Sequence, residues 1–586
     1  MKKLLLLITI CGVFAVNNAD AQKRLPVDKF FAAAGTPANP KVKATWNFYR
    51  NLNQIESLCK EIAAAYPDLA KAYSIGKSYE GNEMWGLTIS DFKNGDPDKK
   101  PAMLIFANIH SNEIQATTMA LYTAWYLTEM HGSNEFIKEL LKDKTFYIVP
   151  TINPDAREYF MYAANTPHSP RAGMIPIDAD RDGYVDEDGY EDFDNDGNIV
   201  QMRRKNSNGS FIADPNYPNK MVKVSPEQQG EYDLLGYEGY DNDGDGRINE
   251  DGVGGYDPNR NFGYAWEPNH IQRGSYKYPM SIIENRHIVD FLIAHPNIGA
   301  GQTYHNNGGM ILTPPGSTDD AESVSKEDAR VYRYIASKGE EMLPGYNQKV
   351  IYRDLYTTVG SDIDYMGLGL GMFTYCNELL SPFDMFNDKY KGDPSNQQYD
   401  FNELLLFGDG MVDWTEVEHP QYGTIEVGGV KKNFSRIHPG FLLESAAHRN
   451  MAFTILHCYH TPKLSIDSVT EKTVAKGVKE ITAVISNSRL MPTHSDWDLK
   501  NKIMRPDWIK IEGAEVLAGM IVADPTGMSR EQIFGTSKEQ KNNPEKLIVD
   551  NIPGNSYVTV KWLVSGDSKY SITVDSNRGG VVTYKK

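Results

Sequence analysis

The segment Met103-Leu-Ile-Phe-Ala-Asn-Ile-His-Ser-Asn-Glu113 joins an apolar run to a polar turn, and a helical pattern follows from 113 to 130. An uninterrupted apolar run of this length is typical of a strand buried on both faces, as in a parallel sheet. A second apolar run covers residues 145–152. Strand, helix and strand in this order indicate an α/β unit, whose chemistry lies beyond the carboxyl ends of its strands.

The same alternation continues along most of the chain. Further helices are predicted over residues 47–64, 281–294, 326–340 and 441–457, and further strands over 298–304 and 372–376. We therefore expect an α/β domain with a mixed, mostly parallel sheet and helices on both faces. After residue 461, short alternating segments at 480–485, 557–562 and 570–574 are separated by Gly, Pro, Asn and Asp turns, a pattern that predicts a small β-sandwich over 462–586.

The N-terminus has the pattern of a secretory signal peptide over residues 1–21. Lys2 and Lys3 precede an apolar stretch at 4–16, and Ala19-Asp20-Ala21 is an A-x-A cleavage site. No later segment approaches the ~20 apolar residues that a transmembrane helix needs. The sequence therefore predicts an exported protein without a membrane span, either periplasmic or secreted, with a main domain over 22–461.

The charge balance excludes one class of partner. The 586 residues carry 60 Lys and Arg against 78 Asp and Glu, a net charge of -18. A chain this acidic is not expected to bind nucleic acid or an anionic membrane. After signal cleavage Cys59, Cys376 and Cys458 remain, and we expect them to be buried as small apolar residues.

Chemistry-bearing residues stand at the predicted strand ends. His110 and Glu113 follow the first apolar run, and His305 ends another strand. Two imidazoles and one carboxylate suit a hydrolytic zinc ion, because they leave a position open for water. Glu378 ends a third strand, where it could act as general base toward that water and then protonate the leaving amine.

These motifs and their intervals resemble the zinc carboxypeptidases of the M14 type over roughly residues 46–460. Asn153-Pro154-Asp155 lies 43 residues after His110, Tyr356 lies 51 residues after His305, and Glu378 lies 22 residues after Tyr356. The resemblance implies a carboxypeptidase-like fold, a zinc cofactor and peptide or protein substrates with a free C-terminus. It gives His110, Glu113 and His305 as zinc ligands and Glu378 as the catalytic glutamate.

Further roles are implied by the same resemblance. Arg260, with Asn259 beside it, would bind the terminal carboxylate, for which a guanidinium fork is well shaped. Tyr356 would cover the substrate, and Ile363 would form an apolar floor of the side-chain pocket. For the oxyanion, Arg203 and Arg204 are adjacent candidates, of which we choose Arg203. One departure is Asn112, which stands where digestive members carry Arg.

A long acidic insertion at about 160–256 carries a repeated pattern. Asp-x-Asp-x-Asp-Gly occurs three times, from residues 178, 192 and 241, and such alternating oxygen ligands are how a loop wraps calcium. Gly replaces the twelfth-position Glu in both full copies, so these are not true EF-hands. The predicted calcium ligands are Asp178, Asp180, Asp182, Asp186, Asp192, Asp194, Asp196, Asp241, Asp243, Asp245 and Asn249.

Three functions remain open at this point. The leading hypothesis is zinc-dependent hydrolysis of the C-terminal peptide bond. The second is a zinc amidase or carboxypeptidase acting on cell-wall (murein) peptides, and the third is a calcium-dependent binding protein on an inactive peptidase scaffold.

Overall fold

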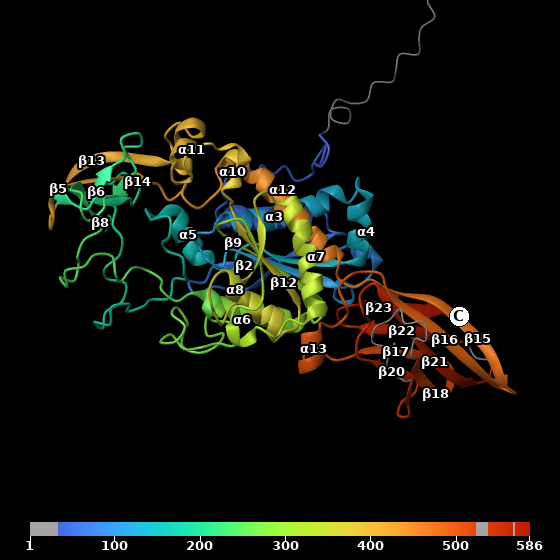
Figure 1. The fold of residues 1–586 in the computed structure, drawn as a ribbon. Coiled ribbons are helices and arrows are strands. Elements are labelled where there is room, and N and C mark those ends of the chain that lie inside the picture. The colour runs from blue at the N-terminus through green and yellow to red at the C-terminus, as the bar shows by residue number, and fades with distance from the viewer. Residues whose placement is uncertain (1–32, 523–536, 567–568) are drawn as a thin grey trace, which may run out of the picture.

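A mixed eight-stranded sheet crosses the centre of the molecule (Figure 1). The computed structural model describes residues 33–522, 537–566 and 569–586, so the predicted signal peptide lies outside them. The strand order is β1 (Ala70–Lys77), β2 (Glu83–Ile89), β4 (Thr145–Val149), β3 (Ala102–Ala107), β9 (Ile298–Asn306), β12 (Phe373–Leu379), β10 (Met310–Thr313) and β11 (Asn347–Val350). The pairings β4–β3, β3–β9, β9–β12 and β10–β11 are parallel, which confirms the predicted mixed, mostly parallel sheet.

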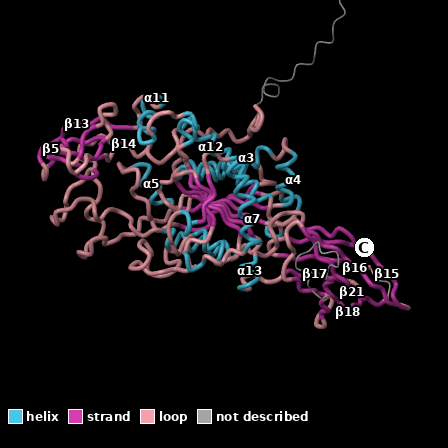
Figure 2. The backbone as a smooth tube through the Cα atoms, viewed as in Figure 1, coloured by secondary structure: helices cyan, strands magenta, loops and turns pink. Residues whose placement is uncertain are grey.

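Helices cover both faces of this sheet (Figure 2). One core holds side chains of α2 (Leu52–Ala65), α3 (Gln115–Met130), α4 (Glu135–Asp143) and α12 (Gly440–Tyr459), and the other holds side chains of α6 (Ile283–Ala294). Met103 and Ile105 of β3 belong to the first core, while Leu104 and Phe106 belong to the second. Because successive side chains of a strand point to opposite faces, the apolar run of β3 is explained by two cores.

The predicted helices and strands of the α/β domain are all present, and the differences lie at their ends. The helix predicted from residue 47 begins at Leu52, because Asn51 and Gln54 form a capping box there. Helix α7 (Lys326–Met342) begins after Ser325, whose side chain accepts the N–H of Asp328. Shorter helices complete the domain: α5 (Pro154–Tyr162), α8 (Ile351–Asp354), α9 (Asp362–Asp364), α10 (Phe383–Phe386) and α11 (Gln397–Leu405).

The insertion builds a second sheet at one end of the molecule (Figure 1). Its order is β13 (Met411–His419), β14 (Gly423–Val430), β5 (Gln201–Gly209), β8 (Gly230–Tyr237), β6 (Phe211–Ala213) and β7 (Met221–Lys223). Val200, Met202, Ile425 and Val427 form its small core. The sequence did not reveal that 411–430 joins the insertion, because that pairing is made by residues some 200 positions apart.

The C-terminal part forms two antiparallel sheets at the opposite end of the molecule from the second sheet (Figure 1). One contains β15 (Leu464–Ala475), β16 (Val478–Asn487), β21 (Ser556–Ser565), β18 (Glu515–Val522) and β19 (Lys538–Gln540), and the other contains β20 (Lys546–Val549), β17 (Asp507–Glu512), β22 (Ser571–Ser576) and β23 (Gly580–Lys585). Both sheets contribute to one core around Trp562. The predicted C-terminal β domain is therefore confirmed. The three predicted segments correspond to β16, β21 and β22, and the sequence analysis did not name the other six strands or the short helix α13 (Asp496–Asn501).

Polar contacts hold the C-terminal sheets against the α/β domain. Arg578 donates to the carbonyl oxygens of Leu370 and Gly371, and the carboxylate of Asp328 on α7 accepts the backbone N–H of Asp496 at 3.0 Å. Lys144, 2% exposed, donates to Thr461 O at 2.9 Å. The two parts are thus joined through buried charged groups as well as apolar contacts.

The cysteine prediction is confirmed, since Cys59, Cys376 and Cys458 are buried free thiols. Among the described residues, none of the helices combines the length and apolar character that crossing a bilayer requires.

Candidate active site

Three neighbouring strands of the central sheet bring the predicted residues together. His110 lies in the turn after β3, and His305 and Glu378 stand opposite each other near the ends of β9 and β12. The order β3–β9–β12 makes these strands adjacent, and all three run in the same direction. Their carboxyl ends therefore meet at one edge of the sheet, as expected for an α/β protein.

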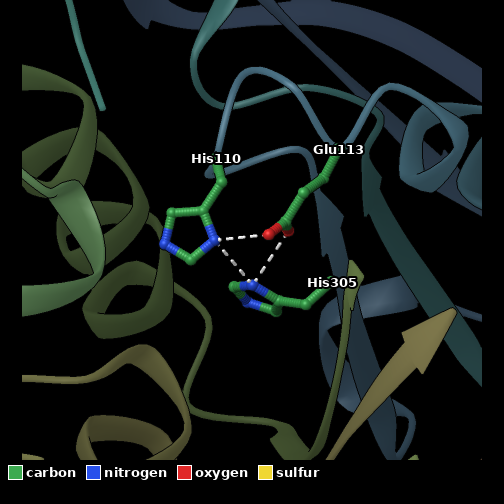
Figure 3. A group of neighbouring side chains, drawn as sticks. All are labelled: His110, Glu113 and His305. Carbon is green, nitrogen blue, oxygen red and sulfur yellow. Dashed lines mark hydrogen bonds and ion pairs between the residues drawn. The ribbon is translucent and has the colours of Figure 1, made fainter. Parts of the chain in front are cut away.

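His110, Glu113 and His305 face one another in a tight group (Figure 3). His110 Nδ1 lies 2.9 Å from Glu113 Oε1, His305 Nδ1 lies 3.1 Å from Glu113 Oε2, and the two Nδ1 atoms are 3.0 Å apart. All three residues are no more than 3% exposed. Residues far apart in the sequence thus present three donor atoms to one small volume.

Two further carboxylates orient the imidazole rings from behind. His110 Nε2 lies 3.2 Å from Asp257 Oδ1, and His305 Nε2 lies 3.5 Å from Asp362 Oδ2. Burial raises the pKa of Asp257, but the charges of Arg171 and His110 outweigh it and hold that pKa well below its usual range. A carboxylate on the remote nitrogen of a ligating histidine fixes the ring and its tautomer. The sequence analysis assigned no role to Asp257 or Asp362.

This donor set fits a zinc ion. Two imidazole nitrogens and one carboxylate are the ligands of many hydrolytic zinc sites, which keep a fourth position for water. Glu113 Oε2 is buried and makes no hydrogen bond, although His305 Nδ1 is close. A cation between these groups would satisfy that oxygen and the two facing nitrogens at once.

Eight of the residues predicted for zinc binding, catalysis and substrate binding line one cavity of about 230 Å³. They are His110, Glu113, Asn259, Arg260, His305, Tyr356, Ile363 and Glu378. The cavity has a polar side around the donor atoms and an apolar side. The structure therefore brings together in one place groups that come from five separate stretches of the chain.

The apolar side of the cavity contains Ile363. Its side chain is 2% exposed and packs in a small cluster with Leu312, Ile351 and Cys376. Tyr356 lies at the rim and is 53% exposed.

Burial raises the pKa of Glu378 to about 7, even though the nearby His305 lowers it. A carboxyl group with a pKa near neutrality is well matched to proton transfer.

Arg260 and Asn259 lie on a short turn beside the cavity. Asn259 Oδ1 accepts the N–H of Asp362 at 2.8 Å, which ties this turn to α9. Arg260 Nη1 donates to Asn259 O at 2.7 Å, and in the described part of the chain no carboxylate forms an ion pair with Arg260. Its guanidinium is therefore available to an anion that enters the cavity.

The structure does not bring Arg203 to this cavity, which corrects its predicted role. Arg203 is on β5 in the second sheet, where Nε lies 2.6 Å from Glu426 Oε2 and the guanidinium lies between the rings of Tyr232 and Trp414. Arg204, the alternative, is on the same strand beside Asp233. Both arginines belong to a strand whose partners the sequence did not reveal.

Two other arginines line the cavity instead. Arg171 lies with Nη2 3.2 Å from His110 Nδ1 and forms an ion pair with Asp257. Arg436 Nη2 donates to Asn306 O at 3.0 Å, and its Nε is buried without a hydrogen bond. Neither stands in a recognisable motif, so only the fold identifies them.

In two acidic loops of the insertion, a carboxylate of each loop accepts backbone N–H groups of the other. Loop 1 (178–189) and loop 3 (241–252) meet at a bridge in which Asp188 and Asp251 exchange backbone hydrogen bonds of 3.3 and 3.1 Å. The carboxylate of Asp251 accepts the N–H groups of Ala179 and Asp186, and that of Asp188 accepts those of Asn242 and Asn249. Each loop thus contains a buried carboxylate that belongs to the other, which the sequence did not reveal.

Loop 2 (192–198) lies beside a buried carboxylate that comes from outside loops 1 and 3. Glu238, directly after β8, is fully buried and accepts the N–H of Val200 on Oε1 at 2.9 Å. Burial raises the pKa of Glu238 to about 8, and repulsion from Asp194, Asp192 and Asp196 adds to the rise.

Comparisons with known proteins identify a family for this chain. A family model described as zinc carboxypeptidase matches residues 55–387, and a model described as a domain of unknown function matches residues 463–585. A zinc carboxypeptidase of Saccharothrix mutabilis subsp. capreolus is 31% identical over 111 residues, which are 19% of this chain and 25% of that protein. An inactive metallocarboxypeptidase ECM14 of Ajellomyces capsulatus is 26% identical over 132 residues, 22% of each chain.

The matched stretches are short. They cover a quarter or less of the length of the first curated relatives. Among solved structures, thrombin activatable fibrinolysis inhibitor aligns with a TM-score of 0.43 at 18% identity, over 72% of this chain and 79% of that one. The family model, however, spans more than half of the sequence. The chain belongs to the zinc carboxypeptidase family.

Proposed function

We propose that the chain removes C-terminal residues from peptides by zinc-dependent hydrolysis of the last peptide bond. The observation that carries this proposal is the convergence in one cavity of a zinc-type donor set, a carboxyl group and the guanidinium of Arg260, which forms no ion pair with a carboxylate of the described residues. The donor set and the carboxyl group supply hydrolysis, and the guanidinium selects a free C-terminus.

His110, Glu113 and His305 hold the metal in this proposal, with Asp257 and Asp362 fixing the two imidazole rings. A zinc ion bound there supplies a Lewis acid that activates water and polarises the scissile carbonyl group. Glu378 takes the proton from the attacking water and gives it to the leaving amine. Its raised pKa of about 7 supports both steps, because the group can bind and release a proton near neutral pH.

Arg171 takes the role that the sequence had given to Arg203. Its guanidinium lies beside His110 Nδ1, so it can donate to negative charge that develops on the carbonyl oxygen next to the donor set. Asp257 holds Arg171 in place through the ion pair. Arg436 adds a third guanidinium to the cavity, whereas position 112 carries a neutral Asn.

Arg260 binds the substrate carboxylate, and Asn259 fixes the turn that carries it. Charge-assisted bidentate hydrogen bonds of this kind favour a free terminal carboxylate over an amide. The apolar side of the cavity, with Leu312, Ile351 and Ile363, then accepts an apolar C-terminal side chain. Tyr356 covers the substrate from the rim.

The test is hydrolysis of N-blocked dipeptides that end in Phe or Leu, compared with the same peptides ending in Lys or Asp. The proposal expects release of the apolar terminal amino acid, loss of activity with a zinc chelator, and recovery with added zinc. Cleavage of murein peptides alone would favour the cell-wall alternative.

An inactive scaffold is the alternative of a different class. A relative of this chain is named an inactive metallocarboxypeptidase. Here the donor set and Glu378 are all present around one cavity, which supports an active enzyme. Absence of turnover in a zinc-loaded protein that binds peptides would favour the binding role.

Export to the periplasm or the medium and calcium binding by loops 1 and 3 stay predictions. Sequencing the N-terminus of the protein after expression with its leader would show whether cleavage follows Ala21. For the two loops, calcium binding is supported by two groups of carboxylate oxygens that lie within 4.8 Å of one another: Asp178, Asp180 and Asp251, and Asp188, Asp243 and Glu250.

A further inference from the structure

Glu238 occupies a position between the two ends of loop 2. Its N–H donates to Val200 O at 3.0 Å, its carbonyl oxygen accepts the N–H of Glu191 at 3.2 Å, and Oε1 accepts the N–H of Val200. Glu191 and Val200 flank loop 2 on its two sides. The backbone of Glu238 thus closes the loop at its base, and its carboxylate bonds to Val200 at the same place.

The second carboxylate oxygen of Glu238 has no partner. The residue is 0% exposed, and Oε2 is buried without a hydrogen bond. The charged groups that act on it include Asp192, Asp194 and Asp196, all of the same sign. A buried carboxylate oxygen that lacks a donor costs free energy, and three negative neighbours increase that cost.

Backbone N–H groups of the loop donate to its own carboxylates, and among the described residues none donates to Asp194 Oδ2 or Asp196 Oδ2. Asp192 Oδ2 accepts the N–H of Gly197 at 2.9 Å, and Asp194 Oδ1 accepts that of Asp196 at 3.1 Å. This is a loop with oxygen groups at alternate positions, and it lacks the acidic residue that closes a calcium loop in sequence. Glu238 supplies a carboxylate at the base of the loop from 40 residues away.

We propose that loop 2 and Glu238 form a calcium site, in which Glu238 Oε2 is the ligand that the loop lacks in its own sequence. The oxygen groups of Asp192, Asp194 and Asp196 complete the carboxylate set. Oxygen-only ligands in a flexible loop suit Ca²⁺, whereas Mg²⁺ demands a regular octahedron and keeps its waters. The site is separate from the hydrolytic cavity and does not depend on the proposed function.

Calcium at this site would link loop 2 to the end of β8 and so hold the start of β5 in the second sheet. The test is calcium titration by calorimetry and thermal unfolding of the mature full-length protein, with zinc kept constant. Glu238→Gln keeps the shape of the side chain and an oxygen for the N–H of Val200. Glu231→Gln, on the exposed side of β8, is the matched control.

The proposal expects one class of calcium site to weaken at least about 10-fold in Glu238→Gln and to stay unchanged in Glu231→Gln. In chelator, Glu238→Gln should be as stable as the wild type or more stable, because Gln keeps the shape of the side chain and cannot carry a negative charge beside Asp192, Asp194 and Asp196. In calcium, the wild type should be the more stable protein. Magnesium should not replace calcium.

Two results would overturn the proposal. The first is the same calcium affinity and stabilisation in Glu238→Gln and wild type. The second is an equal loss of stability with and without calcium, which would make Glu238 a packing residue. Sites in loops 1 and 3 would persist in this variant, so they cannot hide either result.

Discussion

Replacing Arg260 by Ala should separate carboxypeptidase activity from general peptide hydrolysis. Arg260 lines the cavity without a carboxylate partner in the described residues, and the guanidinium can make two charge-assisted hydrogen bonds to a terminal carboxylate. Hydrogen bonds to charged groups contribute about 1.5–3 kcal/mol each. Because Arg260 is only partly buried, we take the lower value, about 3 kcal/mol in total, which corresponds to a loss of about 100-fold in kcat/KM.

The assay compares a blocked dipeptide with a free C-terminus and the same peptide as its amide. The variant should lose about two orders of magnitude on the acid and change little on the amide, whose cleavage is slow in both proteins. Arg273→Ala, an exposed arginine later in the chain that does not line the cavity, is the matched control and should behave as wild type. Equal losses on acid and amide would refute the assignment and indicate that Arg260 stabilises the cavity and not the substrate carboxylate.

Three further predictions concern catalysis, metal binding and stability. Glu378→Gln should lower kcat by about 10²–10⁴-fold and leave the zinc content measured by mass spectrometry unchanged; unchanged kcat would remove Glu378 from proton transfer. Asp257→Asn should weaken zinc binding by about 10–100-fold in chelator competition, and unaltered affinity would mean that Asp257 does not orient its imidazole. Burial lowers the pKa of His494, but Asp498 and Asp507 raise it to about 9. The folded pKa is therefore above the usual 6.5, so the stabilisation, on the order of 3 kcal/mol, is present below pH 6.5 and is lost as the pH rises through 9. Chemical unfolding should show the gap between wild type and His494→Gln closing over that range, and a constant gap would contradict it.

The zinc-type donor set could be predicted from the sequence because each member lies at or just after the end of a predicted buried strand. Parallel strands place their carboxyl ends at one edge, so His110 and His305 were expected to be near each other without knowledge of the loops. The same local rule identified the strand that carries Glu378. These residues depend on the most regular part of the fold, where sequence pattern and structure agree.

Arg171 could not be found in this way. It lies in an irregular segment whose position is set by packing against the turn after β3, where Arg171 O accepts the N–H of Ser111 at 3.1 Å. Arg203 was chosen from two adjacent arginines, and its strand turned out to pair with β14, whose residues carry no signal of that contact. Long-range pairing of irregular insertions leaves no local period in the sequence.

Glu238 shows the same limit for the acidic loops. The repeat of aspartates was visible, but the carboxylate at the base of loop 2 comes from the end of another strand. The pair Asp188 and Asp251 is similar, because each belongs to one repeat and its carboxylate accepts backbone N–H groups of the other repeat. Repeats predict the loops, and only tertiary structure shows which groups complete them.

The zinc content of purified protein, with X-ray absorption at the zinc edge, is the decisive measurement for the metal centre. We expect one tightly bound zinc per chain with nitrogen and carboxylate oxygen ligands, and its loss in His305→Ala while the fold is retained. Wild-type protein that takes up no zinc, or a His305→Ala variant that binds it with the same ligand signature, would contradict the assignment of His110, Glu113 and His305 as the metal centre.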